Sequence, residues 1–322
     1  MSTLQEWSLP EIRSDKAFVT VSPVEGGFIT LPEKAFVAPV DLGARRTVPS
    51  LAFLITHPGL DDTGSIGIGT SRRPLRLMFD LGTRSEVGQY LPEQQAHLKT
   101  REPHRLGPGV VKHLATGNIA PEDIDIVMYS HIHWDHHGDP ENFPTSKFLV
   151  GSGSLNVLKY GLPGKGSHQF FDPDLLPMER TLELPSAEAG ECQRAERSWK
   201  WNPIGPFPAG LDLFGDGSIY VIDAPGHLPG HVNLLCRTGP GRWVCLCGDA
   251  YHDKRLLTGE KEIGTWMDEH GGTLCIHLDK RVAEESIRRL RELAKLEYVE
   301  IIAAHDLEWY EQNKERLFPR NL

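Results

Sequence analysis

The feature that most constrains this chain is a group of polar side chains that follows a buried strand. Residues 124–129 (IDIVMY) form a short apolar run typical of a buried strand, and the segment HIHWDH (131–136) comes one residue later. A regular strand would direct positions 131, 133 and 135 to one face and 136 to the other, and a helix would spread them around its axis. The side chains can therefore converge only if the strand ends in a loop that wraps around a site. The candidate ligands are His131, His133, Asp135 and His136, and imidazole with carboxylate suits zinc and similar divalent metals.

Three more candidate ligands stand at the ends of other expected strands. They are His227 after the strand 218–222, Asp249 after the strand 242–247, and His305 after the strand 298–303. Each has an ordinary structural explanation when taken alone, because a turn, a helix cap or the edge of a core can place such a residue there. Their shared position at strand ends, together with the first group, favours one common metal site.

The order of the expected elements favours an α/β fold built in layers. Further apolar runs at 50–55, 75–79 and 147–150 predict strands, and the segments 108–116 and 279–296 predict helices, the second clearly amphipathic. Strands with intervening helices, and polar residues at strand ends, are typical of a layered α/β enzyme.

The chain of 322 residues is long enough for one large domain or two. We expect an N-terminal extension at 1–47 that packs on a domain spanning 48–322. Within that domain, the segment near 155–210 is irregular and rich in Pro, Gly and aromatic residues, which is typical of a binding loop that shapes a pocket. Candidate walls of that pocket are Phe170, Phe171, Trp199, Trp201, Phe207 and Trp266, although aromatic residues more often pack in a core.

The amino-acid composition argues against several classes of binding partner. The net charge is −10, so polyanions such as nucleic acids and anionic membranes are poor partners. No apolar run approaches the roughly 18 to 20 residues that a membrane helix needs, and the first residues lack the features of a secretory signal. An odd count of five cysteines argues against a disulfide framework and favours a reducing compartment. We therefore expect a cytoplasmic protein with no nucleic-acid or membrane partner; a homodimer is left open.

The motifs HIHWDH (131–136), PGH (225–227), GDA (248–250) and AAHD (303–306) together resemble those of the metallo-β-lactamase superfamily, over about residues 48–310. The resemblance implies an αββα sandwich with two divalent metal ions at the edge of its sheets. Zinc is favoured, with manganese and iron as alternatives. By this resemblance, one metal is held by His131, His133 and His227, the second by Asp135, His136 and His305, and Asp249 bridges both.

The string PGHLPGH (225–231) and the pair His305-Asp306 are similar to the N-acyl-homoserine lactonase branch of that superfamily. This resemblance implies a hydrolase that acts on a small-molecule cyclic acyl substrate, a lactone or a lactam. The ring would be opened by attack of a metal-bridging hydroxide. His231, in the same string, is expected to support the ligands rather than to bind metal.

One departure from that branch concerns the candidate catalytic residues. The lactonases carry a tyrosine three residues after the bridging aspartate, whereas here Tyr251 stands two residues after Asp249 and His252 takes the third position. We expect Asp135, Tyr251 or His252 to supply the proton to the leaving group. Because the tyrosine is shifted, lactam hydrolysis is expected nearly as strongly as lactone hydrolysis.

Two other functions remain as alternatives. One is a thioester hydrolase of the glyoxalase type, and the other is a non-catalytic protein that binds a ligand through its metals. Metal content without turnover on a panel of esters, amides, thioesters and phosphodiesters would favour the second alternative.

Overall fold

The computed structural model describes residues 7–10, 17–59, 74–163, 170–189, 191–194, 197–268 and 270–322. Two six-stranded sheets dominate these residues. The first sheet has the order β1 (Thr20–Pro32), β3 (Arg45–His57), β4 (Leu75–Phe79), β5 (Ile126–Met128), β6 (Lys147–Val150) and β7 (Thr181–Glu183). The second has the order β10 (Asn202–Ile204), β11 (Phe207–Asp212), β12 (Ile219–Asp223), β13 (Val232–Gly239), β14 (Arg242–Leu246) and β18 (Val299–Ile302).

Strand direction changes within each sheet. In the first sheet β1, β3 and β4 are antiparallel, and β4 to β7 run parallel. The second sheet is antiparallel from β10 to β14, and β18 is added parallel to β14. Three short pairs complete the strands: β2 (Val37–Ala38) with β15 (Glu262–Ile263), β16 (Thr265–Met267) with β17 (Thr273–Cys275), and β8 (Glu191–Arg194) with β9 (Arg197–Lys200).

Alternating side chains along the strands join the two sheets face to face. In β4, Leu77 belongs to the core between the sheets, while Met78 belongs to the core on the outer face of the first sheet. In β14, Leu246 likewise points to the shared core and Cys245 to the outer core of the second sheet. Because successive side chains of a strand point to opposite faces, each sheet buries both of its faces and needs a helical layer outside.

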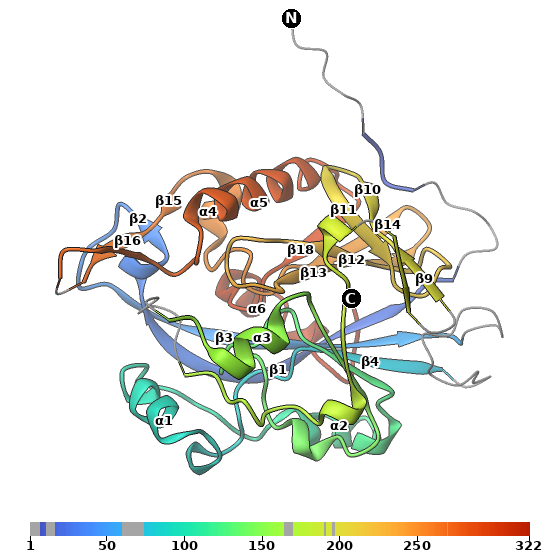
Figure 1. Cartoon of the computed structure of the whole chain (residues 1–322), viewed down its shortest axis with the longest axis horizontal. Helices are drawn as coiled ribbons and strands as arrows, with labels where there is room; N and C mark the ends of the chain where they lie inside the picture. The colour runs from blue at the N-terminus through green and yellow to red at the C-terminus, as the bar shows by residue number, and fades with distance from the viewer. Residues whose placement is uncertain are drawn as a thin grey trace, which may run out of the picture.

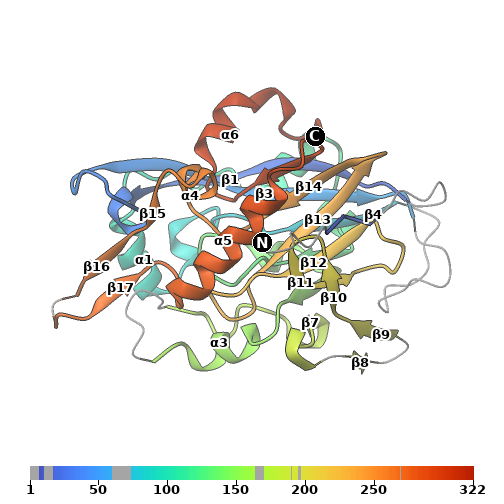
Figure 2. The ribbon, with the colours of Figure 1, turned by 90° about the horizontal axis from the view of Figure 1, so that it is seen from above.

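The described residues contain six α-helices. They are α1 (Pro92–Lys99), α2 (Val110–Thr116), α3 (Ser154–Tyr160), α4 (Lys254–Thr258), α5 (Lys280–Leu293) and α6 (Leu307–Gln312). Leu114 of α2 and Val157 of α3 join the outer core of the first sheet, whereas Ile287 and Leu290 of α5 join that of the second. Figure 1 shows α5 and α2 on opposite sides of the sheets, and Figure 2 shows α5 lying over them. The predicted αββα sandwich is therefore confirmed.

Most predicted elements agree with the structure, and two further segments also supply strands. The segment 1–47 supplies β1 and β2, so its residues 20–32 pair with β3 as part of the first sheet. The segment 155–210, expected to be irregular, ends in β10 and β11 of the second sheet. Both strands contain proline, and β10 lies at the sheet edge, where a missing N–H is tolerated. Among the described residues, no helix is long and apolar enough to cross a membrane.

Candidate metal centre

The candidate ligands lie where strands of both sheets end, along one edge of the sandwich. β5 ends just before the HIHWDH segment (131–136). In the second sheet, β12, β14 and β18 lead to His227, Asp249 and His305. Residues far apart in the sequence are therefore brought together because their strands end at the same edge.

Gly248 lets the end of β14 approach the end of β5. Its φ of 46° lies in the left-handed region, and a Cβ added there would lie 2.5 Å from the Cβ of Ser130. Glycine alone avoids both problems, because it has no Cβ. The two sheets are also joined here by the Val232 N–H, which donates to the Ser130 carbonyl at 2.8 Å. Asp249 is thereby held beside the loop that carries the first ligands.

Three histidines present ring nitrogens to one point. Nδ1 of His133 lies 2.9 Å from Nε2 of His131 and 3.0 Å from Nε2 of His227. Together with a carboxylate oxygen of Asp249, these nitrogens form a group in which all ligand atoms lie within 4.8 Å of one another. We call this group the first ligand set.

A second group lies beside it. Its ligand atoms come from Asp135, His136 and His305 and also lie within 4.8 Å of one another. Nε2 of His305 is 3.6 Å from Oδ2 of Asp135. The two groups together contain every metal-ligand candidate that the sequence predicts, and we call the second group the second ligand set.

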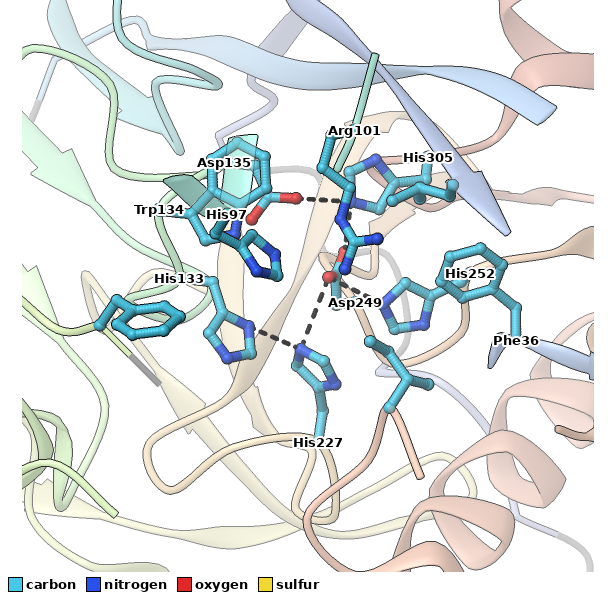
Figure 3. A pocket seen from close by; sticks show the side chains of 13 residues that line it. Phe36, His97, Arg101, His133, Trp134, Asp135, His227, Asp249, His252 and His305 are labelled. Carbon is cyan, nitrogen blue, oxygen red and sulfur yellow. Dashed lines mark hydrogen bonds and ion pairs between the residues drawn. The ribbon is translucent and has the colours of Figure 1, made fainter. Parts of the chain in front are cut away.

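Asp249 stands between the two sets, with one oxygen toward each. Its Oδ2 lies 3.7 Å from Nε2 of His131 and 3.5 Å from Nε2 of His227. Its Oδ1 lies 3.2 Å from Nε2 of His136 and 3.4 Å from Nε2 of His305. Figure 3 shows this carboxylate at the centre of the converging side chains.

Asp80 and Ser130 orient two of the histidines from behind. The carboxylate of Asp80 accepts hydrogen bonds from the Ser130 N–H and hydroxyl, both at 2.7 Å. Since the Ser130 hydroxyl gives its one hydrogen to Asp80, its oxygen accepts from Nδ1 of His131 at 3.0 Å. The same carboxylate accepts from Nδ1 of His136 at 3.0 Å. When neutral, both rings therefore turn an Nε2 lone pair toward the site.

Three further hydrogen bonds orient His305 and His231. Nδ1 of His305 donates to the carbonyl of Pro49 at 2.7 Å, which leaves its Nε2 lone pair for the site. His231 accepts from the Asp249 N–H through Nε2 and donates to the Ala224 carbonyl through Nδ1, both at 3.0 Å. Both of its nitrogens are thus used, so His231 lies where a supporting residue is expected.

The arrangement fits divalent cations. Nε2 of neutral His136 and Oδ1 of Asp249 are both acceptors, and two acceptors 3.2 Å apart repel unless a proton or a cation lies between them. Nδ1 of His133 has at most one hydrogen, which cannot satisfy both His131 and His227. A cation that accepts several lone pairs satisfies each of these groups, and the mixture of imidazole and carboxylate suits zinc.

The electrostatics of the two sets differ. Burial lowers the pKa of His131 and His227 well below the usual value, and their neighbouring histidines lower it further. Burial also acts to lower the pKa of His136, but Asp249 and Asp80 outweigh it and hold that pKa well above the usual value. Without metal, His131 and His227 of the first set are therefore neutral and have lone pairs for a cation, while His136 of the second set retains a proton.

The structure separates the two other candidate catalytic residues. His252 lines the pocket over the site, and its Nε2 donates to Oδ2 of Asp249 at 2.9 Å. Its ring stacks on Phe36, with ring centroids 5.3 Å apart. Tyr251 is fully buried in the outer core with residues such as Cys245 and is not among the residues that line this pocket. Burial raises the pKa of Tyr251 well above its usual value, which disfavours ionisation.

A small pocket opens above the ligands, with about 80 Å³ of free space. The seven candidate ligands form what we call the floor of the site. What we call the wall consists of Leu31, Phe36, His97, Arg101, Phe170 and Ile276. Of the aromatic residues considered from sequence, Phe170 lines the pocket, and Phe171 stacks on His133 with centroids 5.8 Å apart. Trp199 and Phe207 lie in the hydrophobic cores.

His97 and Arg101 were not identified from the sequence. His97 lies in the last turn of α1 and Arg101 stands two residues after the end of that helix, but nothing in the sequence shows that this segment covers the site. Burial, with the help of Arg101, lowers the pKa of His97 to about 4, so its ring is neutral at pH 7. Gln94 of α1 donates to the carbonyl of Phe170 at 2.8 Å and so joins two segments of the wall.

Comparison with known proteins agrees with the geometry of the site. Residues 76–305 match the family described as the metallo-beta-lactamase superfamily. This match covers most of the chain, and the chain belongs to that superfamily. The resemblance inferred from the HIHWDH, PGH and GDA motifs is thereby confirmed.

Curated relatives carry several names. The cytochrome P450 monooxygenase mpaDE′ of Penicillium brevicompactum is 27% identical over 71% of this chain but only 28% of its own length. The chain thus spans less than a third of that longer protein. The metallo-hydrolase mfmC of Annulohypoxylon moriforme is 29% identical over 90% of this chain and 78% of the relative. The gamma-lactamase FDB1 of Fusarium pseudograminearum is 30% identical over 69% of this chain and 50% of the relative.

A solved structure shares the fold. An N-acyl homoserine lactone hydrolase, with the product N-hexanoyl-L-homoserine at its catalytic metal centre, superposes with a TM-score of 0.64. The match covers 95% of this chain and 100% of that chain at 17% identity. At this identity the likeness establishes the common sandwich architecture.

Proposed function

We propose that this protein is a hydrolase that uses two divalent metal ions to open a small cyclic ester or cyclic amide. The observation that carries the proposal is the position of Asp249, whose two oxygens face two separate ligand sets. By the arrangement of these sets, His131, His133 and His227 would hold one ion and Asp135, His136 and His305 the other, with Asp249 between them. When bound, the pair of ions would lower the pKa of a water toward about 7 and polarise the substrate carbonyl.

The side chains around the ions have different roles in the reaction. Asp135 lines the pocket and can accept a proton from the attacking water and return it to the leaving group. The Nε2 hydrogen of His252 is engaged by Asp249, so His252 is better suited to hold that carboxylate than to donate a proton. Tyr251 lies in the core and takes no part in this scheme. Asp135 is therefore our proposed proton carrier.

The reaction is a hydrolysis in which one water is consumed. A new bond forms between the water oxygen and the acyl carbon, and the ring C–O or C–N bond breaks. One proton of the water passes to the departing oxygen or nitrogen. The product is an open-chain hydroxy acid or amino acid. A nitrogen leaves poorly without a proton, so a lactam depends on Asp135 more strongly than a lactone does.

Three observations support a small cyclic acyl substrate. The free space of about 80 Å³ is well below the roughly 300 Å³ or more of pockets for drug-sized ligands. The PGHLPGH string (225–231) is similar to that of lactonases. Among relatives, FDB1 is named a gamma-lactamase, and the lactone hydrolase shares the fold. Lactones and lactams have the same reacting group, so one site can serve both.

The test is a hydrolysis panel with zinc-loaded protein. The panel contains γ-lactones, γ-lactams, thioesters and phosphodiesters, and elemental analysis accompanies it. We expect about two metal ions per chain and turnover of a cyclic ester or amide. A firm stoichiometry of one overturns the two-metal mechanism. Cleavage of thioesters or phosphodiesters alone overturns the substrate class, and metal binding with no turnover of any substrate favours a non-catalytic role. Asp249→Ala protein purified in the same way controls for a contaminating hydrolase.

A further inference from the structure

The wall of the pocket, as defined above, contains one permanent cation, Arg101, which stands two residues after the end of α1. Figure 3 shows its guanidinium group projecting over Asp249 between the two sides of the pocket. Arg101 lines the pocket together with the apolar side chains of Leu31, Phe36 and Ile276. Its position between apolar walls and charged ligands makes it the strongest polar group that a substrate meets above the floor.

The backbone around Arg101 is held from two sides. The Thr30 N–H of β1 donates to the Arg101 carbonyl at 3.0 Å. Nη2 of Arg45 donates to the carbonyls of Thr100 at 2.9 Å and Glu102 at 3.1 Å, which flank Arg101. These bonds fix the main chain, so the direction in which the Arg101 side chain leaves it is set before any ligand binds.

The guanidinium group has no hydrogen bond or ion pair with any residue that the structure describes. Other arginines near the site are paired: Arg84 contacts Glu141 at 2.8 Å, and Arg255 contacts Asp253 at 2.7 Å. The carboxylate that acts on Arg101 most strongly is Asp135, which belongs to the second ligand set. A half-buried cation without a dedicated partner is costly, and an anion brought by a ligand would offset that cost.

The charge of the loaded pocket also favours an anion. Two divalent ions would carry +4, the carboxylates of Asp135 and Asp249 carry −2, and a hydroxide formed from the attacking water would carry −1, so Arg101 would add to a field that is still positive. His97 contributes no charge at pH 7, because its pKa is lowered to about 4 by burial. The pocket therefore attracts anions although the chain as a whole has a net charge of −10.

We propose that Arg101 determines substrate specificity by binding a carboxylate that the cyclic substrate carries outside its reacting ester or amide. This inference rests on the proposed function and sharpens it: the substrate is an anionic lactone or lactam. A planar guanidinium pairs with a carboxylate through two parallel N–H bonds, which fixes orientation as well as affinity. The substrate would then be held at two points, with its carbonyl at the floor and its carboxylate at the wall.

The test compares two γ-lactones that differ only in charge. One carries a carboxylate on the ring, and the other carries a carboxamide at the same carbon. With zinc-loaded protein, we expect kcat/KM to favour the carboxylate by about tenfold or more. Arg101→Met should remove this preference by raising KM for the carboxylate while leaving the carboxamide nearly unchanged. Arg101→Lys should restore part of the preference, because it returns the charge without the planar fork.

Lys99→Met is the matched control. It removes one positive charge two residues away, from an exposed position on α1. We expect it to leave both substrates unaffected. Equal rates for the two lactones in the parent protein, or an unchanged preference in Arg101→Met, overturn the inference. A loss of metal and of both activities in Arg101→Met also overturns it, because Arg101 would then act only through Asp135.

A binding experiment separates this inference from the proposed hydrolysis. The probe is a cyclopentanone carboxylate, a ketone that cannot be hydrolysed, titrated calorimetrically into zinc-loaded protein. Binding that weakens about tenfold or more in Arg101→Met supports the carboxylate site even if no lactone or lactam is opened. Equal binding to the parent and to Arg101→Met refutes the site even if the ring substrates are hydrolysed.

Discussion

The floor and the wall of the site are built in different ways. Four of the seven floor residues lie in the single segment 131–136, and the others follow the ends of strands. The side chains of Asp80 and Ser130 hold the floor from behind. The wall is assembled from β1, the turn before β2, α1 and two loops. Its segments are joined by hydrogen bonds such as those from Gln94 to the Phe170 carbonyl and from the Thr30 N–H to the Arg101 carbonyl.

The difference indicates that the floor and the wall have separate roles. A floor in which the rings of His131, His136 and His305 are each oriented by a second hydrogen bond can present ligands with little reorganisation when a cation binds. A wall made of separate segments can vary in shape and charge while the floor stays intact. We therefore expect changes in the floor to remove chemistry altogether. Changes in the wall should alter the preference among substrates.

The largest effect should come from the centre of the floor. Asp249→Ala removes the carboxylate that faces both ligand sets, so metal content should fall and activity should drop by at least about a thousandfold. Elemental analysis and a lactone assay on metal-replete protein measure the two effects. Asp174→Ala, an exposed aspartate, is the control and should change neither. Retention of both metals with full activity in Asp249→Ala would show that the floor does not depend on this carboxylate.

The layer behind the floor should matter less than the floor itself. Asp80→Asn replaces an acceptor that binds Ser130 and His136, so the orientation of His136 is weakened. We expect metal affinity to fall by about 10- to 100-fold, as measured by competition with a chelator. Asp123→Asn, whose carboxylate caps a short turn, is the matched control. An unchanged affinity in Asp80→Asn would mean that the ligands are oriented without this support.

Metal binding should release protons from the second ligand set. The pKa values of His136 and His305 are raised in the metal-free protein, because Asp249 and other carboxylates outweigh the effect of burial. A cation must displace such a proton, so affinity should rise by about tenfold per pH unit for each proton displaced, up to the raised pKa. Calorimetry in buffers of different ionisation enthalpy counts the protons. A heat that does not depend on the buffer contradicts the assignment.

The raised pKa values of these histidines have the opposite consequence for the stability of the metal-free protein, which should fall as pH rises. A histidine whose pKa is raised on folding stabilises the fold below its unfolded value of about 6.5, and this contribution is lost as pH rises through the folded pKa. Metal-free protein should therefore lose stability between neutral and alkaline pH. The loaded protein should lose stability as pH falls, because protons then compete with the metals.

The smallest effect on kcat is expected at positions 251 and 252, and it should distinguish His252 from Tyr251. His252→Ala removes the hydrogen bond to Asp249 and should lower kcat by about tenfold. Tyr251→Phe should leave kcat within about twofold, because its buried hydroxyl has no hydrogen-bond partner among the described residues. Thermal unfolding of Tyr251→Phe should be unchanged or shifted upward for the same reason. A tenfold loss of kcat in Tyr251→Phe would show that Tyr251 does take part in catalysis.

Periodicity located several of the strands and helices, and the resemblance in the HIHWDH, PGH and GDA motifs implied their αββα arrangement. The runs at 75–79 and 147–150 coincide with β4 and β6, and the amphipathic segment at 279–296 contains α5. Such elements are predictable because their side chains alternate between two faces or recur on one face of a helix. β1 was missed because four of its residues are proline or glycine, and its pairing with β3 is a long-range contact.

The sequence by itself determined the identity of the candidate ligands, because a HIHWDH segment after a buried strand has few other uses. Only the tertiary structure decided how the oxygens of Asp249 divide between two sets, and that His252 rather than Tyr251 meets the pocket. It also decided that Arg101 projects over the floor. The physical reason is that local patterns encode which face of an element is buried. Contacts between distant elements depend on how the two sheets and their loops pack, and no local pattern records that packing.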